Sequence, residues 1–269
     1  MSHKDVQGRR LNLRDALRAT AKAMPRLWLG ASGVLVAAVM AWTIPLFVAL
    51  DAGIAPWVSG AAALLTLMAV GALARLSIST DARAVRALGL GPLGFQFGWP
   101  EPRLVGAALL CLIFLGMIVA MLGLVVLAIA GVAELDVAAI QARDWGGVGP
   151  AWKLVVLIVV GLGALLIPLL LAVRLSLFVP ATLGRRQMVS LNSMGIAYGS
   201  FWQILGGLVV TAAPLVVLLS LAAAGLPGGV LGHTVLIVGL VAIQLPLTLG
   251  FLGTAYRRLE YWSPEEGKA

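Results

Sequence analysis

The chain has 269 residues, of which 61% are hydrophobic and 11% charged, and its mean hydropathy is +1.04. A soluble domain has about 25% charged residues, and no soluble fold of this length buries so much apolar surface, so we predict an integral membrane protein with several spans. The net charge of +8 could suggest nucleic-acid binding. The basic residues are placed as at a membrane surface, so we expect no nucleic-acid partner.

The first 26 residues form a basic segment that precedes the first apolar run. Asn12 followed by Asp15 resembles a helix N-cap, and leucines and a methionine share one face of the helix that follows. We predict a short amphipathic helix over 12–24 that ends at Pro25 and lies on an anionic leaflet. The segment is too long for a cleavable signal peptide, so we expect an uncleaved anchor. Its basic face consists of Arg14, Arg18 and Lys22.

Six apolar stretches are each long enough to cross about 30 Å of hydrocarbon as a helix. The 70 residues between Arg186 and Arg257 carry no charge and are too long for one helix, but they divide at Gly-Leu-Pro-Gly-Gly, residues 225–229. We therefore predict an all-α polytopic bundle over 27–256, followed by a tail at 257–269. Its transmembrane helices are expected at about 27–50, 55–74, 104–133, 154–176, 201–224 and 230–255.

The distribution of Lys and Arg predicts the orientation. The loops on one side hold 17 of the 19 basic residues, and the opposite loops hold only Arg143 and Lys153. By the positive-inside rule both termini are cytoplasmic, and the spans form three helical hairpins with short interfacial helices on the cytoplasmic side. Seven of the eight tryptophans, Trp28 among them, are expected at the membrane interfaces, whereas Trp42 lies inside a span.

The three predicted hairpins end alike, with an arginine followed within two residues by leucine at the cytoplasmic boundary. The matches are short, so a triplicated hairpin and chance similarity are both open. We expect these arginines to mark the membrane boundary and to reach lipid phosphates. After the second of them, residues 175–183 are expected to lie along the interface or to pack under the bundle, with Pro180 turning the chain. The boundary arginines are Arg75, Arg174 and Arg257.

Groups for catalysis are scarce. No Asp or Glu lies inside a predicted span, and the chain has one cysteine and two histidines without zinc-ligand spacing. Glu101 belongs to the cytoplasmic side. We find no nucleophile beside a base, so we predict no enzyme activity, no cofactor and no metal site.

The polar residues inside the spans are candidates for ligand contact or for structural roles. Gln244 is the best of them, because it lies two residues before Pro246, where proline frees a backbone carbonyl that an amide can satisfy. Both readings stay open at this point. The other candidates are Thr211, Thr248 and His233.

Three stretches, at 87–110, 174–207 and 245–259, resemble uncharacterised six-helix inner-membrane proteins of alphaproteobacteria. More loosely, they are similar to the membrane domain attached to some glycerophosphodiester phosphodiesterases and to the YciC-like family. The resemblance implies the bacterial inner membrane and a role in membrane or envelope homeostasis. It carries no catalytic or binding residues, since the family pattern defines none, and the phosphodiesterase activity is not expected because this sequence lacks that catalytic domain. The shared pattern reads Arg174, Leu175, Leu177, Pro180, Ala181, Gly199, Phe201 and Trp202.

These observations favour a non-catalytic inner-membrane protein that acts through contacts with lipids or protein partners, in membrane homeostasis or as a subunit of a complex. Anionic lipids of the cytoplasmic leaflet, a membrane-protein partner or a second copy are the expected partners. A transporter or flippase-like protein for a neutral or amphipathic solute is the alternative, because prolines interrupt several spans. An enzyme acting on lipid headgroups has the least support.

Overall fold

The computed structural model describes residues 10–79, 81–225 and 227–260, and every regular element in these ranges is a helix. The predicted all-α class is therefore confirmed. The elements are α1 (Leu13–Phe47), α2 (Ala55–Ile78), α3 (Ala82–Ala87), the 3-10 turn η1 (Pro92–Gly94), α4 (Pro100–Val132), α5 (Val137–Gln141), α6 (Ala151–Leu175), α7 (Phe178–Gly184), α8 (Ser193–Ile196), α9 (Phe201–Ala223), α10 (Gly229–Val238), the π-helical turn η2 (Gly239–Gln244) and α11 (Leu245–Leu259).

Six helical segments are long and apolar enough to cross a membrane, and they follow the six predicted spans in order. The last of them, Gly229–Leu259, runs through α10, η2 and α11 without interruption. The predicted turn at 225–229 separates it from α9, with Gly225 and Gly229 at positive φ.

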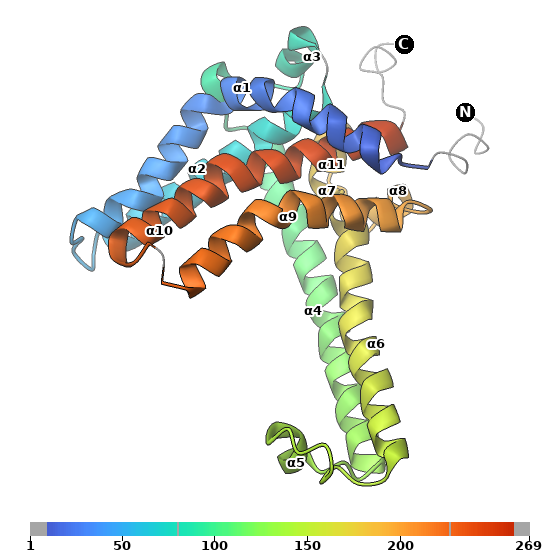
Figure 1. The fold of residues 1–269 in the computed structure, drawn as a ribbon. Coiled ribbons are helices and arrows are strands. Elements are labelled where there is room, and N and C mark those ends of the chain that lie inside the picture. Colours follow the sequence, from blue (N-terminus) through green and yellow to red (C-terminus); the bar gives the residue numbers. More distant parts are fainter. Residues whose placement is uncertain (1–9, 80, 226, 261–269) are drawn as a thin grey trace.

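The helices form two parts of different character (Figure 1). A body contains α1, α2, α9 and the α10–α11 segment, whereas α4 and α6 extend away from it side by side and carry α5 at their far tip. Helix α7 joins the two parts, because it contacts both α2 and α4. The α4–α6 pair therefore meets the body at one end only.

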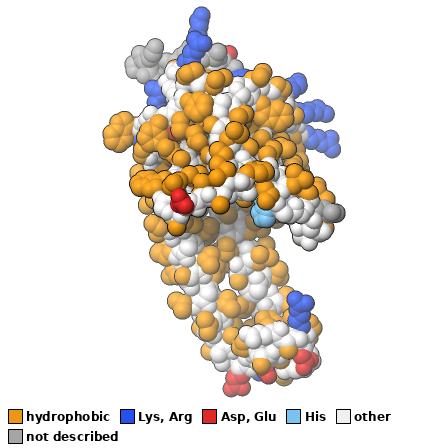
Figure 2. Space-filling view, turned by 90° about the vertical axis from the view of Figure 1, so that its left-hand side faces the viewer, with side chains coloured by type: hydrophobic (Ala, Val, Ile, Leu, Met, Phe, Trp, Pro, Cys, Tyr) orange, Lys and Arg blue, Asp and Glu red, His pale blue; other side chains and the backbone are white. Residues whose placement is uncertain are grey.

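Most of the protein core lies at that junction. Residues 71–78 of α2 are buried without exception, as are residues 249–256 of α11 and 179–184 of α7. The same end carries the predicted boundary arginines, and we call it the basic end. Figure 2 shows most of the visible Lys and Arg at this end, Asp and Glu together with a smaller basic group at the tip of the α4–α6 pair, and hydrophobic side chains over much of the surface between them.

Glycines allow the body helices to approach closely. A Cβ atom on Gly253 of α11 would lie 1.9 Å from Ser77 Oγ of α2, and one on Gly207 of α9 would lie 1.9 Å from Phe251 Cζ. At Gly253 a side chain would require the two helices to separate, because Ser77 Cβ and its backbone are also close, whereas at Gly207 the Phe251 ring would have to move. Small residues are the usual device for close helix packing in membranes, because lipid supplies no hydrophobic force between helices.

The predicted surface helix is wrong in one respect, since α1 does not end at Pro25 but continues through it to Phe47. Figure 1 shows that α1 changes direction along its length, as proline-containing helices do. The buried positions Thr20, Met24 and Leu27 form one continuous stripe across the proline, so packing holds the helix together. Asn12 accepts the Asp15 N–H as predicted, and Arg14, Arg18 and Lys22 are all exposed on one face.

Residues 175–183 pack under the bundle, as expected, and most of them form α7. The chain turns at residues 176–177, before the helix, so the prediction that Pro180 makes the turn is wrong. Pro180 lies in the first turn of α7, where no intrahelical donor is lost. A short helix, α5, lies in the loop before Gly146.

The last span contains a π-helical turn just before Pro246. The Pro246 ring crowds the carbonyl of Ala242, four residues earlier, and proline has no N–H to donate to it. The wider π-helical turn relieves this clash. Trp28 of α1 donates its indole N–H to the Ala242 carbonyl over 2.8 Å. The freed carbonyl is therefore satisfied by an interface tryptophan rather than by Gln244.

Replacing Trp28 with phenylalanine should destabilise the protein by about 1 kcal/mol, the range measured for hydrogen bonds between membrane helices. Thermal unfolding in detergent measures this loss. Trp99→Phe is the control. Because Trp99 is 79% exposed, its replacement should change the free energy of unfolding by less than about 0.5 kcal/mol. Equal losses in both variants would show that the bond to Ala242 contributes nothing.

Candidate functional site

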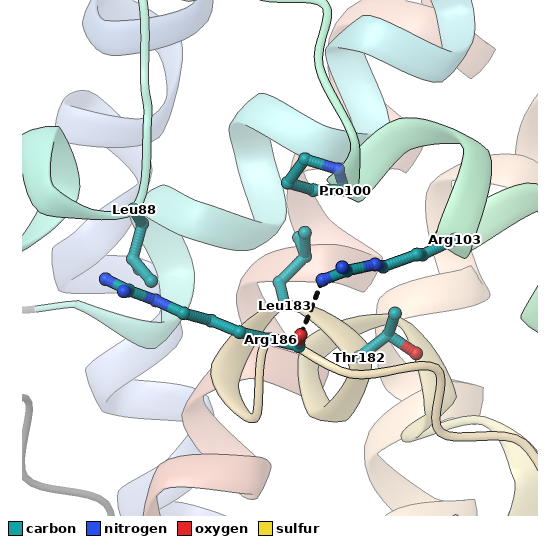
Figure 3. A pocket seen from close by; sticks show the side chains of 6 residues that line it. All are labelled: Leu88, Pro100, Arg103, Thr182, Leu183 and Arg186. Atoms are coloured by element: carbon teal, nitrogen blue, oxygen red, sulfur yellow. Dashed lines mark hydrogen bonds between the residues drawn. The ribbon is translucent and has the colours of Figure 1, made fainter. Parts of the chain in front are cut away.

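Two adjoining cavities lie at the basic end, where α4 begins and α7 ends, and they share Leu88 and Pro100 as lining residues. The first, which we call the arginine cavity, has a volume of about 110 Å³ and is drawn in Figure 3. The second, the ion-pair cavity, has a volume of about 140 Å³. The arginine cavity is lined by Leu88, Pro100, Arg103, Thr182, Leu183 and Arg186; the ion-pair cavity by Arg75, Leu88, Gly89, Gln96, Phe97, Gly98, Pro100 and Glu101.

The ion-pair cavity contains a buried salt bridge. Arg75 Nη2 lies 2.7 Å from Glu101 Oε1, and the two side chains are 2% and 0% exposed. Arg75 Nε donates to the Leu88 carbonyl, and Glu101 Oε2 accepts the Gly98 N–H, each over 2.9 Å. Glu101 lies in the first turn of α4, where the helix dipole favours a carboxylate. Arg75 therefore does not reach lipid phosphate, contrary to the prediction, because the protein encloses it.

Some polar atoms beside this pair have no partner. Arg75 Nη1 and Gln96 Oε1 are buried without a hydrogen bond among the described residues, whereas Gln96 Nε2 donates to the Met68 carbonyl. A Cβ on Gly71 would lie 2.9 Å from Arg75 Nη1, so glycine leaves the space that the guanidinium occupies. The cavity offers one donor and one acceptor without net charge, which suits water or a neutral polar group.

The arginine cavity carries two cations. Arg103 Nη1 donates to the Arg186 carbonyl over 2.6 Å, and Arg186 Nη2 donates to the Ala87 carbonyl over 2.9 Å. Figure 3 shows the Arg103 side chain reaching from α4 toward the chain at Arg186, whose own side chain extends toward Leu88. These bonds connect α3, α4 and the end of α7, and they leave the other guanidinium N–H groups free for further partners.

Two acids near this end of α7 are already paired. Glu101 pairs with Arg75, and Glu260 pairs with Arg185, which donates to it from Nε over 2.7 Å. Burial alone would lower the pKa of the Arg185 guanidinium, but its hydrogen bond to Glu260 and the charge of that carboxylate outweigh burial and raise the pKa above its ordinary value. Thr182 is occupied too, since its hydroxyl exchanges hydrogen bonds with the Val189 backbone.

The other two boundary arginines lie at the basic end, as the topology requires, but in different surroundings. Arg174 and Arg257 are half-buried, and the Nε atom of each is buried without a hydrogen bond among the described residues. Neither lines one of the two cavities. Their contact with lipid phosphate stays a prediction, and the three arginines of the sequence repeat do not share one environment.

The intramembrane polar candidates mostly bond within their own helices. Gln244 Nε2 donates to Thr248 Oγ1 over 2.8 Å, one turn further along. Thr211 donates to the Leu208 carbonyl, and His233 Nδ1 lies 2.9 Å from the Gly229 carbonyl. Hydroxyls in helices commonly form such local bonds. Of the four candidates, Gln244 and Thr248 therefore bond to each other. Neither cavity is lined by any of the four.

Sequence reasoning missed the centre of this site. From the sequence, Glu101 is expected only on the cytoplasmic side, and Arg103 and Arg186 count only among the basic residues of that side. The one available signal was Glu101 at the start of a long apolar helix, since acids so placed are often N-terminal caps. Among the described residues, no three His, Cys, Asp or Glu side chains are grouped so that they could hold a metal ion.

Comparison with models of protein families, with curated proteins and with solved structures produced no match. The resemblance to six-helix inner-membrane proteins therefore stays a prediction from the sequence.

Proposed function

We propose that this protein is a non-catalytic membrane protein that acts through contacts of its membrane-embedded surface with lipids or with protein partners. Membrane homeostasis or the role of a subunit in a membrane complex fits this description. We place it in the bacterial inner membrane, with the six spans arranged as three hairpins and both termini in the cytoplasm. The gathering of Lys and Arg at one end, visible in Figure 2, supports this orientation.

One observation carries the proposal: the α4–α6 pair is almost entirely unburied by the protein's own helices. Along the apolar stretch of each segment, 6% of the residues are buried for α4 and none for α6. The body segments bury between 17% and 56% of theirs. A helix pair anchored at one end, with apolar side chains on its free faces, offers lipid or partner chains a large contact surface.

The orientation is tested by labelling single cysteines in a Cys111→Ala background with a membrane-impermeant maleimide. In spheroplasts whose inner membrane is intact, we expect the cysteine of Asp136→Cys, at the tip of the α4–α6 pair, to react with the maleimide. Arg83→Cys, on α3 at the basic end, should react only after the membrane is permeabilised. The reverse pattern would place both termini outside the cytoplasm.

The transporter alternative has one supporting observation. The π-helical turn at Gly239–Gln244 lies within a span, and Gln244 Oε1 is buried without a hydrogen bond among the described residues. Such turns are frequent at functional sites. Trp28 and Pro246 already account for the turn, however, and both cavities described above lie at the basic end.

Photocrosslinking in native membranes tests the proposed function. A benzophenone amino acid at Leu124 of α4 or Leu165 of α6, both exposed, should give one discrete protein adduct or lipid adducts. The same group at exposed Val217 of α9 is the matched control for a body helix. Solute flux into proteoliposomes that is lost in Gln244→Leu would replace this proposal with the transporter.

A further inference from the structure

We propose that the arginine cavity binds the phosphate group of an anionic phospholipid in the leaflet at the basic end. This inference rests on the proposed function, because it names a lipid contact for a protein that acts through its membrane surface. Arg103 and Arg186 would hold the phosphate.

The cavity has an excess of positive charge. Among the described residues neither Arg103 nor Arg186 forms an ion pair, and Glu101 and Glu260 are held by other arginines. Two guanidinium groups around one cavity repel each other unless an anion lies near them. An arginine pairs especially well with phosphate, because its planar fork can donate two parallel hydrogen bonds.

Each of the two exposed side chains is held by one hydrogen bond to the backbone before any ligand arrives. Each uses one N–H for a backbone carbonyl, Arg186 O in one case and Ala87 O in the other, so neither guanidinium must be ordered on binding. The volume of about 110 Å³ is room for several water molecules and hence for one phosphate group. Leu88, Pro100 and Leu183 form apolar walls that strengthen charged hydrogen bonds inside.

Arg186 occupies a backbone position that favours glycine. It follows the end of α7 with φ of 53°, in the left-handed region that helices commonly use for a terminal glycine. A residue with a Cβ is strained there by about 1 kcal/mol. Arginine at this position therefore has a cost to stability, and a use for its guanidinium explains why the chain carries it.

The surroundings of the cavity place the anion at a lipid surface. Phe95, Phe97 and Trp99 alternate along the loop before α4 and are exposed, whereas Gln96 between them bonds inward to the Met68 carbonyl. Exposed aromatic side chains of this kind lie at the headgroup level of a membrane. Leu110, seven residues after Arg103 and so on the same helix face, is exposed and offers apolar surface to an acyl chain.

Native mass spectrometry of the full-length protein in detergent, titrated with phosphatidylglycerol, tests this inference. We expect Arg186→Gly and Arg103→Gln each to weaken binding by about tenfold or more, as for the loss of charged hydrogen bonds. Arg83→Gln is the matched control, because Arg83 is exposed at the same end and lines neither cavity, and it should bind as the unaltered protein does. Phosphatidylcholine, whose cationic choline the arginines repel, should bind weakly to all variants.

Arg186→Gly separates binding from folding, since glycine relieves the positive φ and should preserve or raise the melting temperature. A lower melting temperature with equal losses for both lipids would mean that Arg186 only connects α7 to α3, and would overturn the inference. Unchanged binding in both cavity variants, or an equal loss in Arg83→Gln, would overturn it too. If inorganic phosphate at millimolar concentration displaces the lipid, the cavity serves a soluble anion and the lipid assignment is wrong. The proposed function would be contradicted by a different measurement, solute flux that is lost in Gln244→Leu, so the two failures can be told apart.

Discussion

Glu101→Leu is expected to lower the free energy of unfolding by about 3–5 kcal/mol, the loss found when one partner of a buried ion pair is removed. The variant leaves the Arg75 guanidinium buried among α2, α4 and the loop between them, with no carboxylate to neutralise it. The Leu88 carbonyl would remain its one hydrogen-bond acceptor. Thermal or denaturant unfolding of the full-length protein in detergent measures the effect.

The double variant Arg75→Leu, Glu101→Leu is the control for this loss. Removing both charges leaves no unpaired ion, and buried pairs replaced by apolar residues often cost little or nothing. We expect the double variant to recover most of the stability lost in Glu101→Leu. A double variant as unstable as the single one would mean that the packing of the Glu101 stem, rather than its charge, holds the junction together.

Gly253→Ala is expected to destabilise the body by about 1–3 kcal/mol, the usual effect of overpacking, or by more if the helices cannot separate. The added methyl would lie 1.9 Å from Ser77 Oγ and 2.4 Å from Ser77 Cβ, at the close contact between α11 and α2. Rotation of the Ser77 side chain cannot remove the clash with its Cβ, so the two helices must move apart. The melting temperature should therefore fall.

Two further variants make this result specific. Gly123→Ala in α4 adds the same methyl where no atom lies within 4 Å, so it should be neutral or slightly stabilising, as alanine favours helix over glycine. Ser77→Gly combined with Gly253→Ala should restore stability, because it removes both clashing atoms. Equal losses from Gly253→Ala and Gly123→Ala would contradict the close contact between α2 and α11.

Much of the architecture follows from one-dimensional properties. The six spans, the turn at 225–229, the Asn12 cap and the exposed basic face of α1 all follow from apolar length, breaker residues and helical periodicity. Each depends on neighbours a few residues apart, so no knowledge of tertiary contacts is needed. The error at Pro25 has the complementary cause, because packing of Thr20 and Leu27 on the body outweighs a local helix breaker.

The candidate site could not be predicted in this way. Arg75 and Glu101 lie 26 residues apart, on two helices and separated by a loop, and Arg103 and Arg186 are further apart still. Whether an arginine at a helix end meets lipid, water or a carboxylate depends on which element folds beside it. Arg75, Arg174 and Arg257 have the same sequence context, yet only Arg75 among them pairs with a carboxylate in the described residues.

The sequence by itself determined that the chain is helical, that six segments can span a membrane and that the charges are gathered at the ends of those segments. Only the tertiary structure decided that α4 and α6 stand apart from the body, and that an ion pair and two arginines meet at their base. The reason is that a helix apolar on every side has no stripe to mark its packing face. Since lipid and protein solvate such a helix almost equally, its partners depend on small residues such as Gly253 and on a few buried polar contacts.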